Sequence, residues 1–238
     1  KLILTTREYV LQQGMESHPS LRGLIKEYGL VCALEEYSDR EKSNILFSHL
    51  YHSDIKYDAV VSIFTQCDRI VYHPNYNPRV LAQFLHSKSD QDLSAEDYFW
   101  MLMEYLDDPS DFWEEVFIEL SEEAKLVAML LFISSTPMMQ GDLELCYQKY
   151  IYGNPAKKAL SDCIAELEQT LIRTSYLDDW NMLEIQFLSP AIQDFIQEFM
   201  KKNCEQYVPV VLDCICFYNQ YLFLLEHQAS AYSQRILD

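Results

Sequence analysis

The chain has 238 residues, 49% of them hydrophobic and 13% aromatic, which is enough to bury about two or three small cores. The formal net charge of −19 argues against nucleic acid as the main partner, because neutralising phosphates requires clustered Lys and Arg, and it equally disfavours docking on an anionic membrane surface. The 5 Gly and 8 Pro are too few for a disordered or fibrous protein, and few for an all-β fold.

The N-terminal part of the chain predicts two short strands among helices. Strands are expected over residues 2–4 and 30–34, and helices over 8–14, 20–28 and 38–51. Ser38 and Glu41 have the spacing of a capping box, which predicts the start of the last of these helices.

The middle of the chain predicts helices only. They are expected over residues 55–67, 78–85 and 94–106, with a further one after Asp108-Pro109-Ser110. Pro78 is well placed as the first residue of its helix, and Ser94 with Asp97 has the spacing of a helix cap. Residues 87–93 are polar and read as a linker.

The rest of the chain has the element order of a winged-helix domain. Helices are expected over 121–136, 141–151 and 155–171, β-like runs over 171–176 and 182–188, and a closing helix over 190–202. Asp178, Asp179 and Asn181 lie between the two runs and predict a hairpin turn. Residues 207–226 predict one more helix, apolar on most faces.

Arg7 is the first candidate for nucleotide binding. It follows an apolar run and Thr5-Thr6, so its guanidinium could project from the C-terminal end of a strand, the edge at which open α/β sheets bind nucleotides. The planar fork of Arg grips a phosphate through two hydrogen bonds. The alternative is that Arg7 pairs with a neighbouring acid such as Glu8.

The segment His73-Pro74-Asn75-Tyr76-Asn77-Pro78-Arg79 is the second candidate. A Pro at a helix start offers a rigid apolar face against which an adenine ring could lie, and the adjacent helix N-terminus favours an anion. The alternative is purely structural, because a Pro in this position also fixes the entry angle of its helix.

Together, Leu2-Ile-Leu-Thr-Thr-Arg-Glu-Tyr9 and the segment over 73–79 resemble a part of the STAND-type NTPases, signalling ATPases related to AAA+ proteins, in their bacterial novel-STAND or NACHT-like branch. The resemblance implies an Arg that senses the γ-phosphate, a Pro that contacts the adenine, and two residues that shape the turn: Arg7, Pro78, Asn77 and His73.

Ser189 is a further candidate by resemblance. Many related proteins have a His in its place that touches the β-phosphate of bound ADP and holds the off state. Ser189 either caps the helix that follows it or donates to a phosphate without bringing charge. This departure puts the ADP-locking mechanism in doubt for this chain.

The resemblance runs from the sensor-1 strand through the helical and winged-helix subdomains. It implies a mainly α fold: a helical bundle subdomain plus a winged-helix subdomain, with a residual piece of an α/β P-loop NTPase domain at the N-terminus. The expected domains are the C-terminal end of the NTPase core, the helical subdomain, the winged-helix subdomain and the start of a further helical region, over residues 1–53, 54–120, 121–204 and 205–238.

The implied function is the regulatory part of an ATP/ADP-dependent signalling switch in bacterial antiphage defence or stress signalling, in which both subdomains close on the nucleotide. ATP or ADP with Mg would bind the intact parent, and neither is expected to bind this fragment tightly. The implied partners are the missing N-terminal NTPase core, further copies of the chain in a homo-oligomer on activation, and a protein trigger sensed by an absent C-terminal region. The expected location is cytoplasmic, with no membrane or nucleic-acid partner.

No catalytic residue and no metal site is predicted. The chain lacks Gly-x-x-x-x-Gly-Lys-Ser/Thr and an apolar strand ending in paired acids, so the fragment is not expected to hydrolyse ATP, whereas the parent is expected to be an ATPase. His49 and His52 lack a third ligand, and the seven Cys have no zinc spacing and predict reduced thiols. No signal peptide and no apolar run of membrane-spanning length is found, and the chain, which begins without Met, is expected to be a fragment.

Two alternatives stay open. The recognition helix of a winged helix would be residues 155–171, and it carries two lysines against three acids: Lys157, Lys158, Asp162, Glu166 and Glu168. Because that face is not basic, closing on the nucleotide domain is favoured over DNA binding. The other alternative is a helical protein-interaction module in which Arg7 and Pro78 are purely structural.

Overall fold

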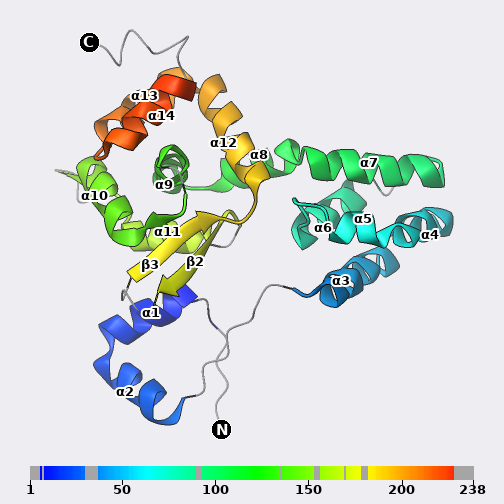
Figure 1. Cartoon of the computed structure of the whole chain (residues 1–238), viewed down its shortest axis with the longest axis horizontal. Coiled ribbons are helices and arrows are strands. Elements are labelled where there is room, and N and C mark those ends of the chain that lie inside the picture. Colours follow the sequence, from blue (N-terminus) through cyan, green and yellow to red (C-terminus); the bar gives the residue numbers. More distant parts are fainter. Residues whose placement is uncertain are drawn as a thin grey trace. The chain divides into compact units, whose positions relative to one another are not determined.

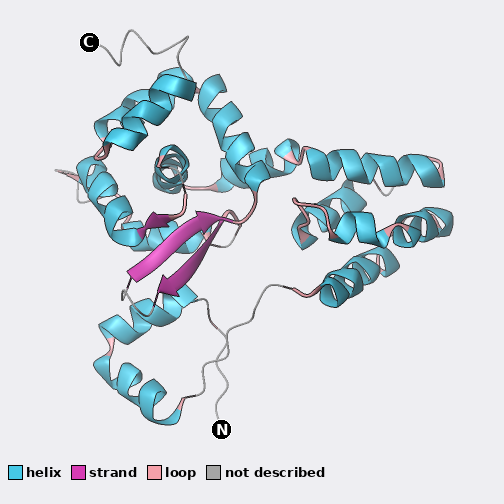
Figure 2. Cartoon of the chain, in the orientation of Figure 1, coloured by secondary structure: helices cyan, strands magenta, loops and turns pink. Residues whose placement is uncertain are grey.

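The computed structural model describes residues 6, 8–29, 37–88, 93–134, 136–152, 156–168, 170–177 and 182–227. Among these residues the protein is mainly helical (Figure 1), with a small three-stranded antiparallel sheet (Figure 2). Arg7 and the strands predicted over 2–4 and 30–34 lie outside the described residues. The chain divides into two compact units.

Unit 2 contains the described residues of 32–115 together with Ser189–Ala191. Its helices are α3 (Asp39–Tyr51), α4 (Tyr57–Thr65), α5 (Cys67–Val71), α6 (Pro78–Ser87), α7 (Ala95–Asp107) and the first part of α8 (Ser110–Glu119). The helix α3 packs on α4, α5 and α6 and therefore belongs to the same unit as they do. The sequence had assigned α3 to the end of the NTPase core and the other three helices to the helical subdomain. The four predicted domain boundaries stay predictions.

Local signals fix where the helices of unit 2 begin. Ser38 Oγ accepts a hydrogen bond from the Glu41 N–H at 3.4 Å, and the Glu41 carboxylate accepts one from the Ser38 N–H at 2.8 Å, which closes the predicted capping box of α3. Ser94 caps α7 by accepting from the Asp97 N–H at 3.2 Å. Pro78 is the first residue of α6, as predicted.

The core of unit 2 lies between α3, α4, α6 and α7. Its fully buried side chains come from each of these helices: Leu46, Ile63, Leu81, Phe84, Phe99 and Leu102. The prediction of one continuous helix over 55–67 was wrong, because the structure has two helices there: α4 ends at Thr65 and α5 begins at Cys67. The Thr65 hydroxyl donates to the Val61 carbonyl at 2.6 Å, a contact that bends helices.

Unit 1 contains the remaining elements. These are α1 (Glu8–Ser17), α2 (Pro19–Tyr28), α9 (Glu122–Ile133), β1 (Met138–Met139), α10 (Gln140–Ile151), α11 (Leu160–Leu167), β2 (Ile172–Leu177), β3 (Met182–Phe187), most of α12 (Pro190–Lys202), α13 (Cys204–Asp213) and α14 (Tyr218–His227).

The helix α9 lies at the centre of unit 1 (Figure 1). Every residue from Ala124 to Ile133 is buried, and α10, α11, α13 and α14 all contact the helix. Lys125 is the one charged residue in that stretch. Its Nζ lies 2.8 Å from Glu122 Oε1, and the Tyr207 hydroxyl donates to Glu122 Oε2 at 3.0 Å, so the buried charge is paired.

The start of α9 is held from α11. Ser121 Oγ caps α9 by accepting from the Ala124 N–H at 3.3 Å. Glu166 of α11 accepts from the Ser121 N–H at 2.7 Å and from its hydroxyl at 2.8 Å, and it forms an ion pair with Lys158. Burial by itself raises the pKa of Glu166, but the hydrogen bonds from Lys158 and Ser121 outweigh it and leave that pKa below its ordinary value.

The sheet has the order β1-β3-β2, with both strand pairs antiparallel. Met138 pairs with Ile185, and Ile172 pairs with Phe187. Along β3, Leu183, Ile185 and Phe187 are buried, as the period of two along a strand requires. The hairpin of β2 and β3 agrees with the prediction, whereas the two-residue β1 was missed.

Two predicted helices were wrong in length. The helix predicted over 155–171 is α11, which begins at Leu160. The helix predicted over 207–226 is α13 and α14, joined by a short connection. The side chain of Gln220 accepts hydrogen bonds from the backbone N–H groups of Cys216 at 2.9 Å and Phe217 at 3.0 Å, which satisfies donors at the start of α14.

Candidate functional site

Three of the predicted site residues lie in one turn. His73 and Asn77 lie in the connection between α5 and α6 of unit 2, and Pro78 follows it as the first residue of α6. Ser189 belongs to the same unit and immediately precedes α12, the position of a helix cap, where it is half-buried. Arg7 lies outside the described residues, so its place relative to the turn stays a prediction.

The imidazole of His73 is held at both nitrogens. Its Nε2 lies 3.0 Å from Asp107 Oδ1 at the end of α7, and its Nδ1 accepts from the Asn75 backbone N–H at 3.2 Å. Because a backbone N–H can only donate, Nδ1 carries a lone pair, and Nε2 carries the proton and donates to the carboxylate. With its side chain 7% exposed, His73 joins the turn to α7 and presents little surface to a ligand.

Asn75 makes a second bridge from the turn to α7. Its Nδ2 donates to the Leu106 carbonyl at 3.0 Å, which fixes the orientation of the amide. Its Oδ1 is buried and has no hydrogen-bond partner among the described residues. The amide therefore supports the turn through one of its two ends.

Two tyrosines tie the turn to α3. The Tyr76 hydroxyl donates to the Lys42 carbonyl at 2.8 Å, and the Tyr72 hydroxyl donates to Asp39 Oδ2 at 3.1 Å. Burial raises the pKa of Tyr76 to about 12, and the hydrogen bond to Asp39 raises the pKa of Tyr72. Both hydroxyls therefore stay protonated donors at neutral pH.

The start of α6 carries the groups that face outward. Asn77 caps the helix, because its Oδ1 accepts from the Arg79 N–H at 2.9 Å. Pro78 follows as the first helical residue and is half-buried, while Arg79 is exposed. Proline has no N–H to lose there, and the first turn of α6 has a partial positive charge. Chemically, this end offers an apolar ring edge, a cation and a helix N-terminus.

The comparisons with known proteins bear on the segment that ends just after α3. Residues 1–52 match the family model described as Novel STAND NTPase 3. This supports a STAND-type NTPase. No curated protein and no solved structure matches the chain. The matched segment includes α1, α2 and α3, and α3 is the helix to which Tyr72 and Tyr76 tie the turn.

Sequence reasoning missed the partners that hold the turn. Asp107, the Leu106 carbonyl and the Lys42 carbonyl lie more than thirty positions from the residues they bind. No local pattern marks them, since an acid at the end of a helix or a backbone carbonyl occurs in most helices. The sequence offered one signal: the turn is rich in aromatic and amide side chains, which commonly form hydrogen bonds within the protein.

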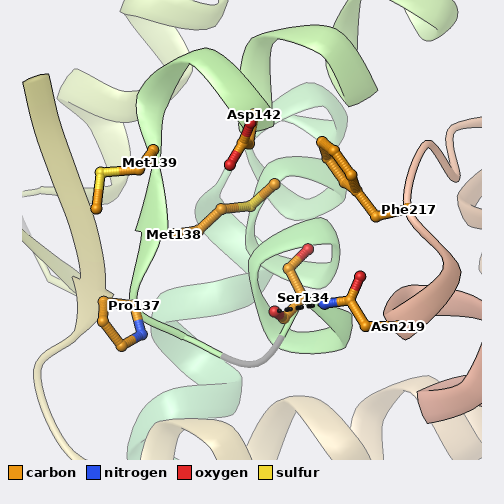
Figure 3. A pocket seen from close by; sticks show the side chains of 7 residues that line it. All are labelled: Ser134, Pro137, Met138, Met139, Asp142, Phe217 and Asn219. Atoms are coloured by element: carbon orange, nitrogen blue, oxygen red, sulfur yellow. Dashed lines mark hydrogen bonds between the residues drawn. The ribbon is translucent and has the colours of Figure 1, made fainter.

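Unit 1 holds a shallow hollow of about 200 Å³ (Figure 3). It is lined by Ser134, Pro137, Met138, Met139, Asp142, Phe217 and Asn219. Asn219 Nδ2 donates to the Ser134 carbonyl at 3.4 Å on one side, and Asp142 and Phe217 flank Met138 on the other. No predicted site residue lines it.

In the part of the chain that the structure describes, none of the helices combines the length and the apolar character needed to cross a bilayer. Nor does any cluster of three or more His, Cys, Asp or Glu side chains within the described ranges have an arrangement that could hold a metal ion.

Proposed function

We propose that this chain is the regulatory part of a STAND-type switch driven by exchange of ADP for ATP, acting in bacterial defence or stress signalling. The observation that carries the proposal is the match of residues 1–52 to the Novel STAND NTPase 3 family. In the proposal the helical and winged-helix subdomains close on the nucleotide, and differential phosphate contacts bias the equilibrium between open and closed states.

The element order of unit 1 supports a winged-helix subdomain within this scheme. From α9 to β3 the order is helix, strand, two helices and a hairpin, and β1 pairs with β3. The described part of α10 and the segment before α11 contain few lysines that could contact DNA phosphates, and one of them, Lys158, forms an ion pair with Glu166. We therefore assign this subdomain an intramolecular role and not DNA reading.

The turn before α6 supports a contact with the base. Pro78 in this proposal lies against the adenine, Asn77 and His73 hold the turn in shape, and Arg7 reads the γ-phosphate. Ser189 donates to a phosphate or only caps α12. The nucleotide, with Mg, binds to the parent protein that includes the NTPase core, in the cytoplasm, and activation assembles a homo-oligomer through a protein trigger.

The test uses the parent protein extended to its natural N-terminus, purified natively and then heat-denatured. About one adenine nucleotide released per chain is expected, and an empty protein that also fails to bind added ATP contradicts the proposal. Arg7→Ala is then expected to weaken nucleotide binding without changing the melting temperature of the nucleotide-free protein. Arg22→Ala, at an exposed position of α2, is the matched control.

Pro78→Ala tests the base contact, with Pro19→Ala as its control, because both prolines stand at the first turn of a helix. Loss of adenine-nucleotide affinity in Pro78→Ala alone supports the contact. If both variants bind adenine nucleotide with equal affinity, Pro78 only fixes the start of α6.

A helical protein-interaction module is the second candidate function, and one observation favours it. Phe47, Tyr51 and Phe64 form an exposed aromatic cluster on α3 and α4, with ring centroids 5.9 Å apart for Phe47 and Tyr51 and 5.5 Å for Phe47 and Phe64. Exposed apolar clusters of this kind mark interaction sites. An empty parent protein in the nucleotide test would leave this function, and capture of partners with and without Tyr51→Ser would test it.

A further inference from the structure

The connection between α13 and α14 is built around one buried amide. Gln220 is 0% exposed, and both ends of its side chain are in use. Its Oε1 accepts from the backbone N–H groups of Cys216 and Phe217, and its Nε2 donates to Ser134 Oγ at 2.8 Å and to Cys146 Sγ at 3.2 Å. The amide therefore links the sulfur of Cys146 in α10 to the backbone N–H of Cys216 in the connection.

The two cysteines differ in access. Cys146 is buried, whereas Cys216 is exposed. Burial raises the pKa of Cys146 to about 11, and the Cys216 thiol contributes to the same rise through hydrogen bonding and charge. Cys146 is therefore a protonated thiol at neutral pH, and the neighbouring Cys216 thiol is open to an oxidant in solvent.

We propose that Cys146 and Cys216 form a reversible disulfide when the protein meets a peroxide, which makes this corner of unit 1 a thiol-oxidation site. The geometry that carries the proposal is the shared Gln220 amide together with the contrast in exposure. Cys214 is also nearby, but it is buried and not attached to Gln220 in the hydrogen bonds described above. The proposal does not depend on nucleotide binding.

The chemistry balances with hydrogen peroxide as the oxidant. The Cys216 sulfur attacks one peroxide oxygen, the O–O bond breaks, and Cys216 becomes a sulfenic acid as the first water leaves. The Cys146 sulfur then attacks the Cys216 sulfur, and the S–O bond breaks. The second water leaves with the Cys146 proton. Two thiols are oxidised and one peroxide is reduced to two waters.

The bond has a consequence for the neighbouring hollow. It joins α10 covalently to the α13–α14 connection. Phe217 and Asn219 follow Cys216 and line the hollow of unit 1 (Figure 3). Oxidation therefore fixes one rim of that hollow against α10.

The experiment is a thiol map of the purified chain after treatment with hydrogen peroxide. Remaining thiols are blocked with N-ethylmaleimide in denaturant, and the protein is digested without reduction for mass spectrometry. We expect one linked peptide pair containing Cys146 and Cys216, two hydrogens lighter than the separate peptides, which dithiothreitol separates. Cys216 in any other disulfide, or Cys216 oxidised to a sulfinic acid while Cys146 is still blocked by maleimide, overturns the proposal.

Two variants sharpen this result. Cys216→Ser changes an exposed residue and is expected to abolish the linked pair, while Cys204→Ser, at the start of α13, is expected to leave it unchanged. If Cys204→Ser also abolishes the pair, the specific assignment fails. Because substitutions at buried Cys146 disturb Gln220, the map of the unaltered chain decides the question whether or not Cys146→Ser folds.

Discussion

The helices α3 and α9 have nearly the same length, 13 and 12 residues, and both begin after a serine cap, yet they use their side chains in opposite ways. Ten consecutive residues of α9 are buried. In α3 only Leu46 and Leu50 are buried, while Phe47 and Tyr51 are 49% and 70% exposed. Packing therefore specifies α9, whereas α3 is specified chiefly by its ends and keeps apolar surface exposed.

The largest effect is expected from opening a cavity beside α9. Leu130→Ala removes a fully buried side chain and should lower the free energy of unfolding by about 2–5 kcal/mol. Guanidinium denaturation followed by circular dichroism measures the loss. Leu130→Met keeps the volume and should cost less than about 1.5 kcal/mol. Equal losses in the two variants would show that packing does not specify α9.

A smaller loss is expected at the start of α9. Glu166→Gln weakens the charge-assisted hydrogen bonds to Ser121 and the ion pair with Lys158, and it should cost about 1.5–3 kcal/mol. Asp162→Asn, on the exposed side of the same helix, is the control and should change stability by less than about 0.5 kcal/mol. Faster hydrogen exchange in the first turn of α9 should accompany the loss in Glu166→Gln alone.

The same carboxylate predicts a dependence on pH. The folded-state pKa of Glu166 lies below its ordinary value, so its contribution is fully present above that ordinary value of about 4.3 and is lost as the pH falls through the folded-state pKa. The difference in unfolding free energy between the unaltered chain and Glu166→Gln should therefore shrink as the pH falls below that ordinary value and through the folded-state pKa. A difference that grows on acidification would contradict the assigned ion pair.

At α3 the cap should matter more than the exposed side chains of its middle. Ser38→Ala removes one half of the capping box and should cost about 1 kcal/mol. Ser48→Ala, at an exposed position inside the same helix, should be neutral or slightly stabilising, because Ala has the higher helix propensity. Hydrogen exchange along α3, measured on both variants, separates fraying of the first turn from loss of the whole helix.

The smallest effect is expected on the exposed face of α3. Tyr51→Ala removes a side chain that is 70% exposed and should change the free energy of unfolding by less than about 0.5 kcal/mol. A loss above 2 kcal/mol in the same denaturation experiment would mean that this face is covered in solution. That result would remove the contrast between the two helices.

The helix starts were predictable from the sequence because their causes are local. Ser38, Ser94 and Pro78 act within one turn of where they stand, and the structure confirms all three. The hairpin of β2 and β3 was predictable for the same reason. The two-residue β1 was not, because Met138 and Met139 become a strand only by pairing with β3, more than forty positions away.

The candidate site was predictable as a segment and not as a geometry. The residues of the segment 73–79 indicated a helix start, and in the structure Asn77 caps α6 and Pro78 is its first residue. The bond that joins His73 to α7 depends on Asp107, and the division of the last predicted helix depends on the buried Gln220. Such long-range partners leave no periodic trace in a single sequence.

The two tyrosine bonds have a mechanical meaning. Tyr72 and Tyr76 fasten the turn to the first turn of α3 at Asp39 and Lys42, and Pro78 follows the turn directly. Both bonds end within one turn of α3, so the start of α3 cannot move away from the turn before Pro78 without breaking them. The turn and the end of the family-matched segment therefore share a boundary held by two tyrosine hydroxyls.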